Sequence, residues 1–352
     1  MKIFSRYMMG AAMAAMAAAG CTEDSPVTNP PVEAPKPVEI ARGGFACGAD
    51  VSWLTEMEKG GATFATAEGT PMECMQLLRD HCGVNSIRLR VWVDPEDGWC
   101  NTDDVLLKAR RATALGMRVM IDFHFSDWWA DPGKQNIPAA WAEMDLEGVK
   151  AAMTAHINEM LTKLAAAGIE PEWVQIGNET RTGMMWPLGS IDTADNFTQM
   201  VNTGYDAVKA VFPDCAVIVH CDEGNSRYLY DRLFGKLADE GARYDMIGMS
   251  LYPEPSEWES TVAACVANID YVQKTFGKPV MICEIGMDYR EADKAKAMMA
   301  ELMARSLELG VKGIFWWEPQ TDPTSGYTKG CFDGGAPTVA LDPFVDFSNS
   351  SK

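Results

Sequence analysis

Short apolar runs alternate with longer segments of helical periodicity from Gly43 to the C-terminus. The short runs have the nearly continuous apolar character of buried parallel strands, and the longer segments have the spacing of amphipathic helices. The predicted strands are Gly44–Trp53, Val84–Val93, Met117–Phe125, Glu172–Glu179, Ala216–Asp222, Tyr244–Tyr252, Pro279–Gly286 and Gly313–Pro319. The predicted helices are Thr102–Gly116, Ala151–Gly168, Asn196–Phe212, Ser226–Gly241, Val262–Phe276 and Asp293–Leu309. We expect Thr102 to cap the first helix, since two Asp residues follow it.

This alternation matches the length and rhythm of a (β/α)8 TIM barrel, an α/β fold. The alternative is an open doubly wound sheet, which carries a Gly-rich phosphate loop after its first strand. The sequence contains no GxGxxG or P-loop motif. No change in composition marks a second domain, so we expect residues 43–352 to form a single barrel domain.

The N-terminus has the pattern of an export signal. Within residues 1–20, Lys2 and Arg6 precede an apolar Ala/Met run that is too short to span a bilayer. The run ends in AAAGC and resembles a bacterial lipobox, in which Cys21 would carry the lipid. An ordinary secretory signal with an incidental Cys is the alternative.

The next segment, residues 21–42, is rich in Pro and Glu and predicts a flexible linker behind the lipid anchor. Glu23 and Asp24 resemble the surface-export signals of Bacteroides-type lipoproteins. We therefore expect an exported protein that is lipid-anchored to the outer membrane and displayed on the cell surface.

The composition excludes several classes of function. The formal net charge is -20, which argues against a nucleic-acid partner and disfavours a polyuronate substrate, whereas a neutral polymer is compatible. There are four His residues and no HExxH motif, so a metal site is not expected. Of the ten cysteines, nine remain if Cys21 is lipidated, so at least one thiol is unpaired. We assign no disulfide pairing.

Polar and aromatic residues gather where the predicted strands end, which is where a barrel places its catalytic groups. This position predicts a substrate-binding set of Asp50, Arg90, Trp92, His124, Asp127, Trp129, Asn178, His220, Tyr252 and Trp317. Arg90 is preferred to Arg88 because it lies nearer the strand end. Aromatic faces stack on pyranose rings and polar groups bind hydroxyls, so the set is typical of a sugar-binding cleft.

Two strand-end carboxylates, Glu179 and Glu284, can together cleave a glycosidic bond. One must protonate the leaving oxygen, and the other must act as nucleophile or as a base for water. Either glutamate alone could be a solvated loop residue or an ion-pair partner. Their joint occurrence on the fourth and seventh strands, with Asn178 beside the first, favours catalysis.

Several longer segments resemble glycoside hydrolase family 53, the endo-β-1,4-galactanases. They are GADVSWLTEMEKGG (Gly48–Gly61), RLRVWVDP (Arg88–Pro95), DFHFSDWWADPGKQNIPAAW (Asp122–Trp141), QIGNETRTGMMWP (Gln175–Pro187) and FWWEP (Phe315–Pro319). The resemblance implies a retaining enzyme with Glu179 as acid/base, Glu284 as nucleophile and Asn178 on the sugar 2-hydroxyl. It implies galactan and galacto-oligosaccharides as partners, no cofactor, and a monomer.

Two positions depart from this pattern, because Phe125 replaces an expected Tyr and Trp128 occupies a variable position. The segment Met287–Met298 is short, and the chain is expected to lack the set of Asp, Asn and His ligands with which some bacterial relatives hold a structural calcium, so that ion is not expected. A glycanase of the same clan acting on mannan or cellulose, and a non-catalytic glycan-binding protein, remain as alternatives.

Overall fold

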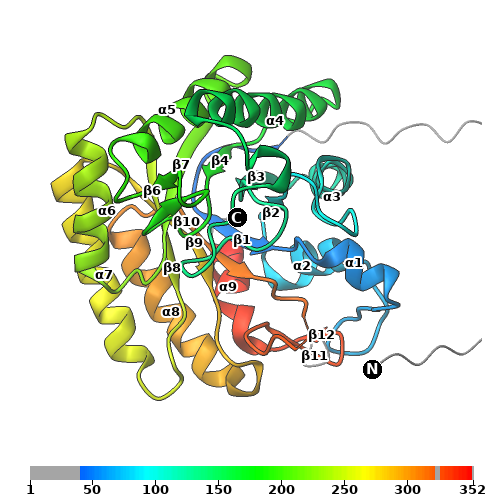
Figure 1. Ribbon diagram of the computed structural model, residues 1–352. Coiled ribbons are helices and arrows are strands. Elements are labelled where there is room, and N and C mark those ends of the chain that lie inside the picture. Colours follow the sequence, from blue (N-terminus) through cyan, green and yellow to red (C-terminus); the bar gives the residue numbers. More distant parts are fainter. Residues whose placement is uncertain (1–39, 322–325, 351–352) are drawn as a thin grey trace, which may run out of the picture. The chain divides into compact units, whose positions relative to one another are not determined.

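Eight parallel strands form a closed barrel in the computed structural model, which describes residues 40–321 and 326–350 (Figure 1). The strands are β1 (Ala46–Asp50), β2 (Ser86–Val91), β3 (Arg118–Phe123), β4 (Trp173–Ile176), β7 (Ala216–Cys221), β8 (Met246–Leu251), β9 (Val280–Ile285) and β10 (Gly313–Trp317). They pair in chain order, and β10 closes the barrel on β1. Each lies inside a predicted run, so the (β/α)8 prediction is confirmed.

Helices surround this barrel (Figure 1). They are α1 (Leu54–Lys59), α2 (Cys74–Cys82), α3 (Thr102–Ala114), α4 (Leu146–Ala166), α5 (Asn196–Val211), α6 (Arg227–Asp239), α7 (Trp258–Phe276), α8 (Ala292–Glu308) and α9 (Asp342–Ser350). Two short ribbons, β5–β6 (Gly183–Met184, Gly189–Ser190) and β11–β12 (Phe332–Asp333, Ala336–Pro337), lie in loops. The sequence did not predict α1, α2 and α9.

The starts of three helices differ from the prediction, and α7 begins at Trp258, four residues before the predicted Val262. The N-cap of α3 is Asn101, whose side-chain oxygen accepts hydrogen bonds from the amides of Asp103 and Asp104, so the choice of Thr102 was wrong. Helix α4 begins at Leu146, five residues before the predicted start, because Asp145 caps it by accepting the Gly148 amide.

An apolar layer fills the interior of the barrel toward the amino ends of the strands. Its members are Ala46, Met120, Trp173, Ile218, Met246, Met281, Cys283 and Phe315. Gly48 belongs to the same packing, because a Cβ there would lie 2.2 Å from the Phe315 ring. This layer closes the barrel from below and leaves the carboxyl ends of the strands to carry the site.

The cysteines of the described residues are all buried thiols. None of the nine forms a disulfide, so they act as small core residues. Cys21 and the rest of the predicted signal and linker up to residue 39 lie outside the described residues. Within the described ranges, no helix is both long and apolar enough to cross a membrane.

Candidate active site

Glu284 reaches the site because β9 contains a β-bulge. Met249 pairs with Ile282, but the next residue of β8, Ser250, pairs with Glu284, so β9 has one residue more than its neighbour. The pairing of β9 with β10 shows the same extra residue in β9, because Ile314 pairs with Ile282 and Trp316 pairs with Ile285. Strict alternation would place Glu284 on the face that Ile282 presents to the helices. The bulge turns the carboxylate toward the barrel mouth.

Glu179 is held by a strained turn after β4. Its φ is 47°, in the left-handed region that non-Gly residues seldom adopt, at a cost of about 1–3 kcal/mol. The Glu179 amide donates to His220 Nδ1 at 3.3 Å, and the Thr180 amide donates to the His220 carbonyl at 2.9 Å. These contacts with β7 fix the backbone that carries the side chain.

The two carboxylates face each other. One oxygen of each, and one nitrogen of His220, lie within 4.8 Å of one another. Retaining glycosidases hold their carboxyl groups roughly 5–5.5 Å apart, whereas inverting enzymes need roughly 6.5–9.5 Å for an intervening water. The separation therefore fits direct attack by one carboxylate on the sugar.

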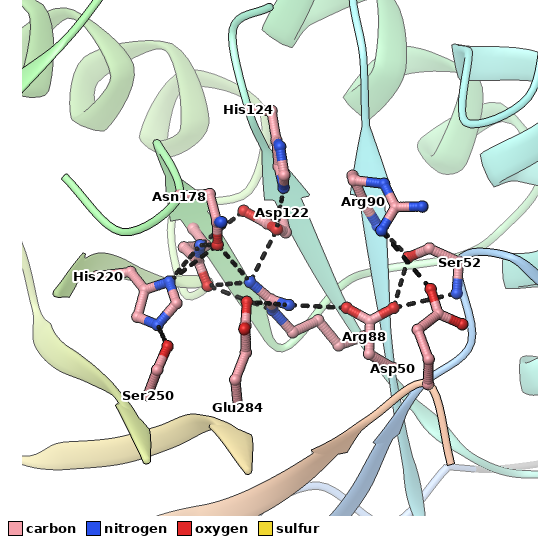
Figure 2. Close-up of polar contacts among 12 residues, drawn as sticks. Asp50, Ser52, Arg88, Arg90, Asp122, His124, Asn178, His220, Ser250 and Glu284 are labelled. Atoms are coloured by element: carbon pink, nitrogen blue, oxygen red, sulfur yellow. Dashed lines mark hydrogen bonds and ion pairs between the residues drawn. The ribbon is translucent and has the colours of Figure 1, made fainter. Parts of the chain in front are cut away.

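Arg88 organises the carboxylates beneath the site (Figure 2). Its guanidinium lies 3.0 Å from Glu284 Oε1, 2.7 Å from Asp50 Oδ2 and 2.8 Å from Asp122 Oδ2. It also donates to Asn178 Oδ1 at 3.0 Å. All five groups are buried, so the pairs are poorly screened by water. The preference for Arg90 as the arginine of the site was wrong, because the neighbouring strands bring Arg88 to Glu284.

Different partners separate the proton affinities of the two glutamates. Burial raises the pKa of Glu284 to about 7, while the Arg88 charge and a 2.8 Å hydrogen bond from the Tyr252 hydroxyl oppose the rise. Burial raises the pKa of Glu179 well above its ordinary value, and the charge of Glu284 raises it further. The pair therefore loses its first proton from Glu284 and keeps the second on Glu179.

His220 supports the acid side of the pair. Its Nδ1 lies 3.3 Å from the Glu179 amide and 3.0 Å from Asn178 Oδ1, and its Nε2 lies 2.8 Å from Ser250 Oγ. Ser250 in turn hydrogen-bonds the Glu179 side chain. Glu179, His220 and Glu284 could by distance hold a cation. However, both imidazole nitrogens already have protein partners, and the site suits a shared proton better than a metal ion.

A cavity of about 470 Å³ lies above the two glutamates. Seven predicted site residues line it: His124, Trp129, Asn178, Glu179, Tyr252, Glu284 and Trp317. Five residues that were not predicted complete the wall: Trp53, Ala130, Asp131, Gly326 and Tyr327. Trp53 lies three residues after the end of β1 at Asp50. A search for site residues that included the first three residues after each strand would have found it. Tyr327 comes from the loop after β10, for which the sequence has no periodic signal.

Arg90 and Trp92 lie behind the cavity wall. The Arg90 guanidinium carbon lies 4.0 Å from the centre of the Trp129 ring and 4.6 Å from that of Trp92, which are cation–π distances. Its Nη1 lies 3.5 Å from Glu318. These contacts hold Trp129 in place, so both residues support the site and do not line it.

Three other predicted residues also lie outside the wall. Asp50 lies beneath it as a partner of Arg88, and His220 lies beneath Glu179. Asp127 accepts hydrogen bonds from the Asp94 amide at 3.1 Å and the Ala139 amide at 2.8 Å, so it organises the loops.

The comparisons with known proteins agree with this geometry. Residues 46–308 match the model described as glycosyl hydrolase family 53. The chain belongs to glycosyl hydrolase family 53. It is 31% identical to a probable arabinogalactan endo-β-1,4-galactanase A of Aspergillus terreus over 311 residues, which are 81% of this chain and 88% of that protein.

Two solved structures resemble this family 53 hydrolase closely. One is from a study of fungal β-1,4-galactanases, with a TM-score of 0.80 and 26% identity over 86% of this chain and 99% of that one. The other is the family 53 catalytic domain of Ignisphaera aggregans, with a TM-score of 0.78 and 27% identity over 85% and 95%. The recognised family, the barrel and the glycoside hydrolase class are thus established.

Proposed function

We propose that this hydrolase cleaves internal β-1,4-galactosidic bonds of galactan, including type I arabinogalactan, with retention of configuration. One observation carries the proposal. Two carboxylates within 4.8 Å of each other differ in proton affinity, because Arg88 and Tyr252 oppose the rise in the pKa of Glu284, whereas the charge of Glu284 raises the pKa of Glu179 further. This arrangement suits a covalent mechanism with a separate nucleophile and acid.

In the first step a Glu284 oxygen attacks the anomeric carbon. The glycosidic C–O bond breaks, and its oxygen takes the proton from Glu179. Arg88 and Tyr252 hold the attacking carboxylate in one orientation, at 3.0 Å and 2.8 Å. The product is a galactosyl ester of Glu284 and a departing chain with a free hydroxyl.

In the second step the Glu179 carboxylate removes a proton from water, and the water oxygen attacks the same carbon. The ester bond breaks, which restores ionised Glu284 and protonated Glu179. Two inversions at one carbon give net retention. Asn178, whose side-chain amide is oriented by Arg88 and by the Ala130 carbonyl, is placed to bind the 2-hydroxyl.

The substrate assignment rests on the relatives named as galactanases and on the cleft. Trp53 packs edge to face against Trp129 and Trp317, whose rings are tilted against each other, and the three rings present aromatic surface to a pyranose ring. The net charge of -20 suits an uncharged polymer. Mannan and cellulose are the competing substrates.

Product analysis on pure polysaccharides tests the proposal. Galactan, mannan and cellulose are incubated with the enzyme, and the anomer of the first product is followed by NMR. We expect short galacto-oligosaccharides that appear first as the β-anomer. Activity on mannan without activity on galactan, or an initial α-anomer, would contradict it. A Glu284→Gln protein serves as the contamination control.

We also propose that Cys21 carries a lipid that anchors the enzyme to the outer membrane, facing outward. The support is the lipobox pattern and the Pro-rich segment behind it. Fatty-acid labelling of the full chain should be lost in Cys21→Ala, which should then appear in the soluble fraction. Labelling that persists would contradict the anchor.

We further propose that catalysis needs no metal or cofactor and that the enzyme is a monomer. Glu284 is paired with Arg88 and Tyr252, and both imidazole nitrogens of His220 have protein partners. Exhaustive EDTA treatment should leave activity and melting temperature unchanged, and light scattering should give the mass of one chain. A metal-dependent fall in either property would contradict the first part.

A further inference from the structure

A second cavity, of about 450 Å³, lies beside the first on the far side of the acid. It shares only Glu179 and Tyr252 with the cavity above the nucleophile. Its other walls come from the end of β8, from the loops after β7 and β8 and from the start of α7, namely Asp222, Glu223, Asn225, Ser250, Pro253, Glu254, Glu257 and Thr261. The two cavities therefore meet at the acid.

The reaction assigns one side of the cleaved bond to each cavity. The nucleophile must reach the anomeric carbon of the sugar that becomes esterified, and Glu284 and Trp317 line only the first cavity. The acid must reach the bridging oxygen, which lies between the two sugars. The departing part of the chain therefore extends from Glu179 into the second cavity.

This second cavity is strongly acidic. Asp222, Glu223, Glu254 and Glu257 line it together with Glu179, and its described walls contain no Lys or Arg. Arg181 lies 3.0 Å from both Asp222 Oδ2 and Glu223 Oε1, and Lys329 Nζ lies 3.7 Å from Glu254 Oε1. The four carboxylates other than Glu179 thus share two cations, which leaves the cavity with a net negative charge.

Asp222 shows what kind of group the cavity accepts. Its side chain is buried, with 6% of the residue exposed, and Oδ1 has no hydrogen-bond partner among the described residues. A buried acceptor without a donor costs about 1–3 kcal/mol. A sugar hydroxyl would donate to this oxygen, whereas a ligand carboxylate offers no proton and would add repulsion.

We propose that the second cavity binds the leaving-group sugar and restricts it to uncharged units, so that a uronate beside the cleaved bond is rejected. This specificity rests on the proposed galactanase function and deepens it. The hydroxyl-accepting Asp222 and the acidic walls act together, because one provides the contact and the others exclude anions. Cleavage therefore occurs within neutral stretches of a polysaccharide and stops short of an acidic unit.

A pair of end-modified oligosaccharides tests the charge dependence. The reducing end of a β-1,4-galactohexaose is either reduced to the neutral alditol or oxidised to the anionic aldonate. The two modified end units are both acyclic and differ in charge. Products are identified by mass spectrometry at low salt. Release of the shortest end-derived product should be at least about tenfold slower for the aldonate, with cleavage displaced away from that end. Added salt should narrow the difference.

The ratio of the alditol rate to the aldonate rate should fall several-fold in a double variant, Glu254→Gln with Glu257→Gln. The matched control is Glu259→Gln, which also removes a negative charge on α7 but does not line this cavity, and it should leave the ratio unchanged. Equal rates and equal product patterns for the two oligosaccharides would overturn the inference while galactan is still hydrolysed. Failure to hydrolyse galactan at all would instead overturn the proposed function, and this inference with it.

Discussion

The two ends of the barrel interior are built on opposite principles. Toward the amino ends of the strands the interior is a dry apolar layer that includes Met120, Trp173 and Phe315. Toward the carboxyl ends, the same strands contribute Asp122, Gln175 and other polar groups, which are hydrogen-bonded around Arg88. The apolar end is stabilised by packing. At the polar end, each buried group has its hydrogen-bond partners only when the whole network is present.

The difference separates stability from catalysis. Removing apolar volume from the lower layer lowers the free energy of unfolding without touching the reacting atoms. Removing one member of the upper network leaves its partners buried and unpaired, because they cannot regain water. Substitutions that remove a member of the polar network should therefore lower both activity and the free energy of unfolding. Substitutions in the apolar layer should lower the free energy of unfolding alone.

The largest effect is expected from Glu284→Gln. The amide cannot attack the anomeric carbon, so kcat/KM on galactan should fall by at least about 10⁴-fold. The melting temperature should not fall, because a neutral group replaces a buried carboxylate. Glu301→Gln on α8 is the control and should retain wild-type activity. Near-normal activity of the Glu284 variant would show that the nucleophile lies elsewhere.

The next effect is expected from Arg88→Leu. Burial alone would raise the pKa of Asp122, but Arg88 and His124 hold it below its ordinary value. Without Arg88 the folded-state pKa of Asp122 and Glu284 rises, so the folded state binds more protons than the unfolded chain and loses stability as pH increases. The free energy of unfolding should fall by about 3–5 kcal/mol.

Chemical denaturation at pH 5 and pH 8 measures this loss, which should be larger at pH 8. Arg305→Leu on the surface of α8 is the matched control. A loss that does not vary with pH would indicate that Arg88 acts by packing alone.

In the apolar layer, Phe315→Ala should destabilise by about 3–5 kcal/mol. The ring is fully buried against Gly48 and contacts Trp173 at 6.0 Å between ring centres. Activity per folded molecule should stay close to wild type below the melting transition, since the ring does not line the site. A large loss of kcat in protein shown to be folded by circular dichroism would mean that the two layers are mechanically coupled.

The smallest effect is expected from Tyr252→Phe, which removes a hydrogen bond to a charged group worth about 1.5–3 kcal/mol. This predicts a loss of about 10- to 100-fold in kcat/KM. The hydrogen bond lowers the pKa of Glu284, so its removal should raise that pKa and move the acidic limb of the pH profile to higher pH. Tyr271→Phe on α7 is the control. An unshifted acidic limb would separate Tyr252 from the ionisation of Glu284.

The sequence correctly predicted what depends on local periodicity. Each strand, and the general position of Glu179, His124 and Trp129 at the strand ends, follows from apolar runs that stop at polar residues. The choice between Arg88 and Arg90 did not follow. Both lie on one face of β2, and the sequence has no information about which level of the neighbouring strands each will meet.

The sequence by itself therefore determined the fold class, the family resemblance and the two candidate carboxylates. Tertiary structure decided that a bulge in β9 aims Glu284 at the barrel mouth, that Arg88 holds it, and that Trp53 and Tyr327 join the wall. The physical reason is the range of each effect. Periodicity records whether a residue is buried, whereas register, strand tilt and loop packing bring together groups far apart in the chain.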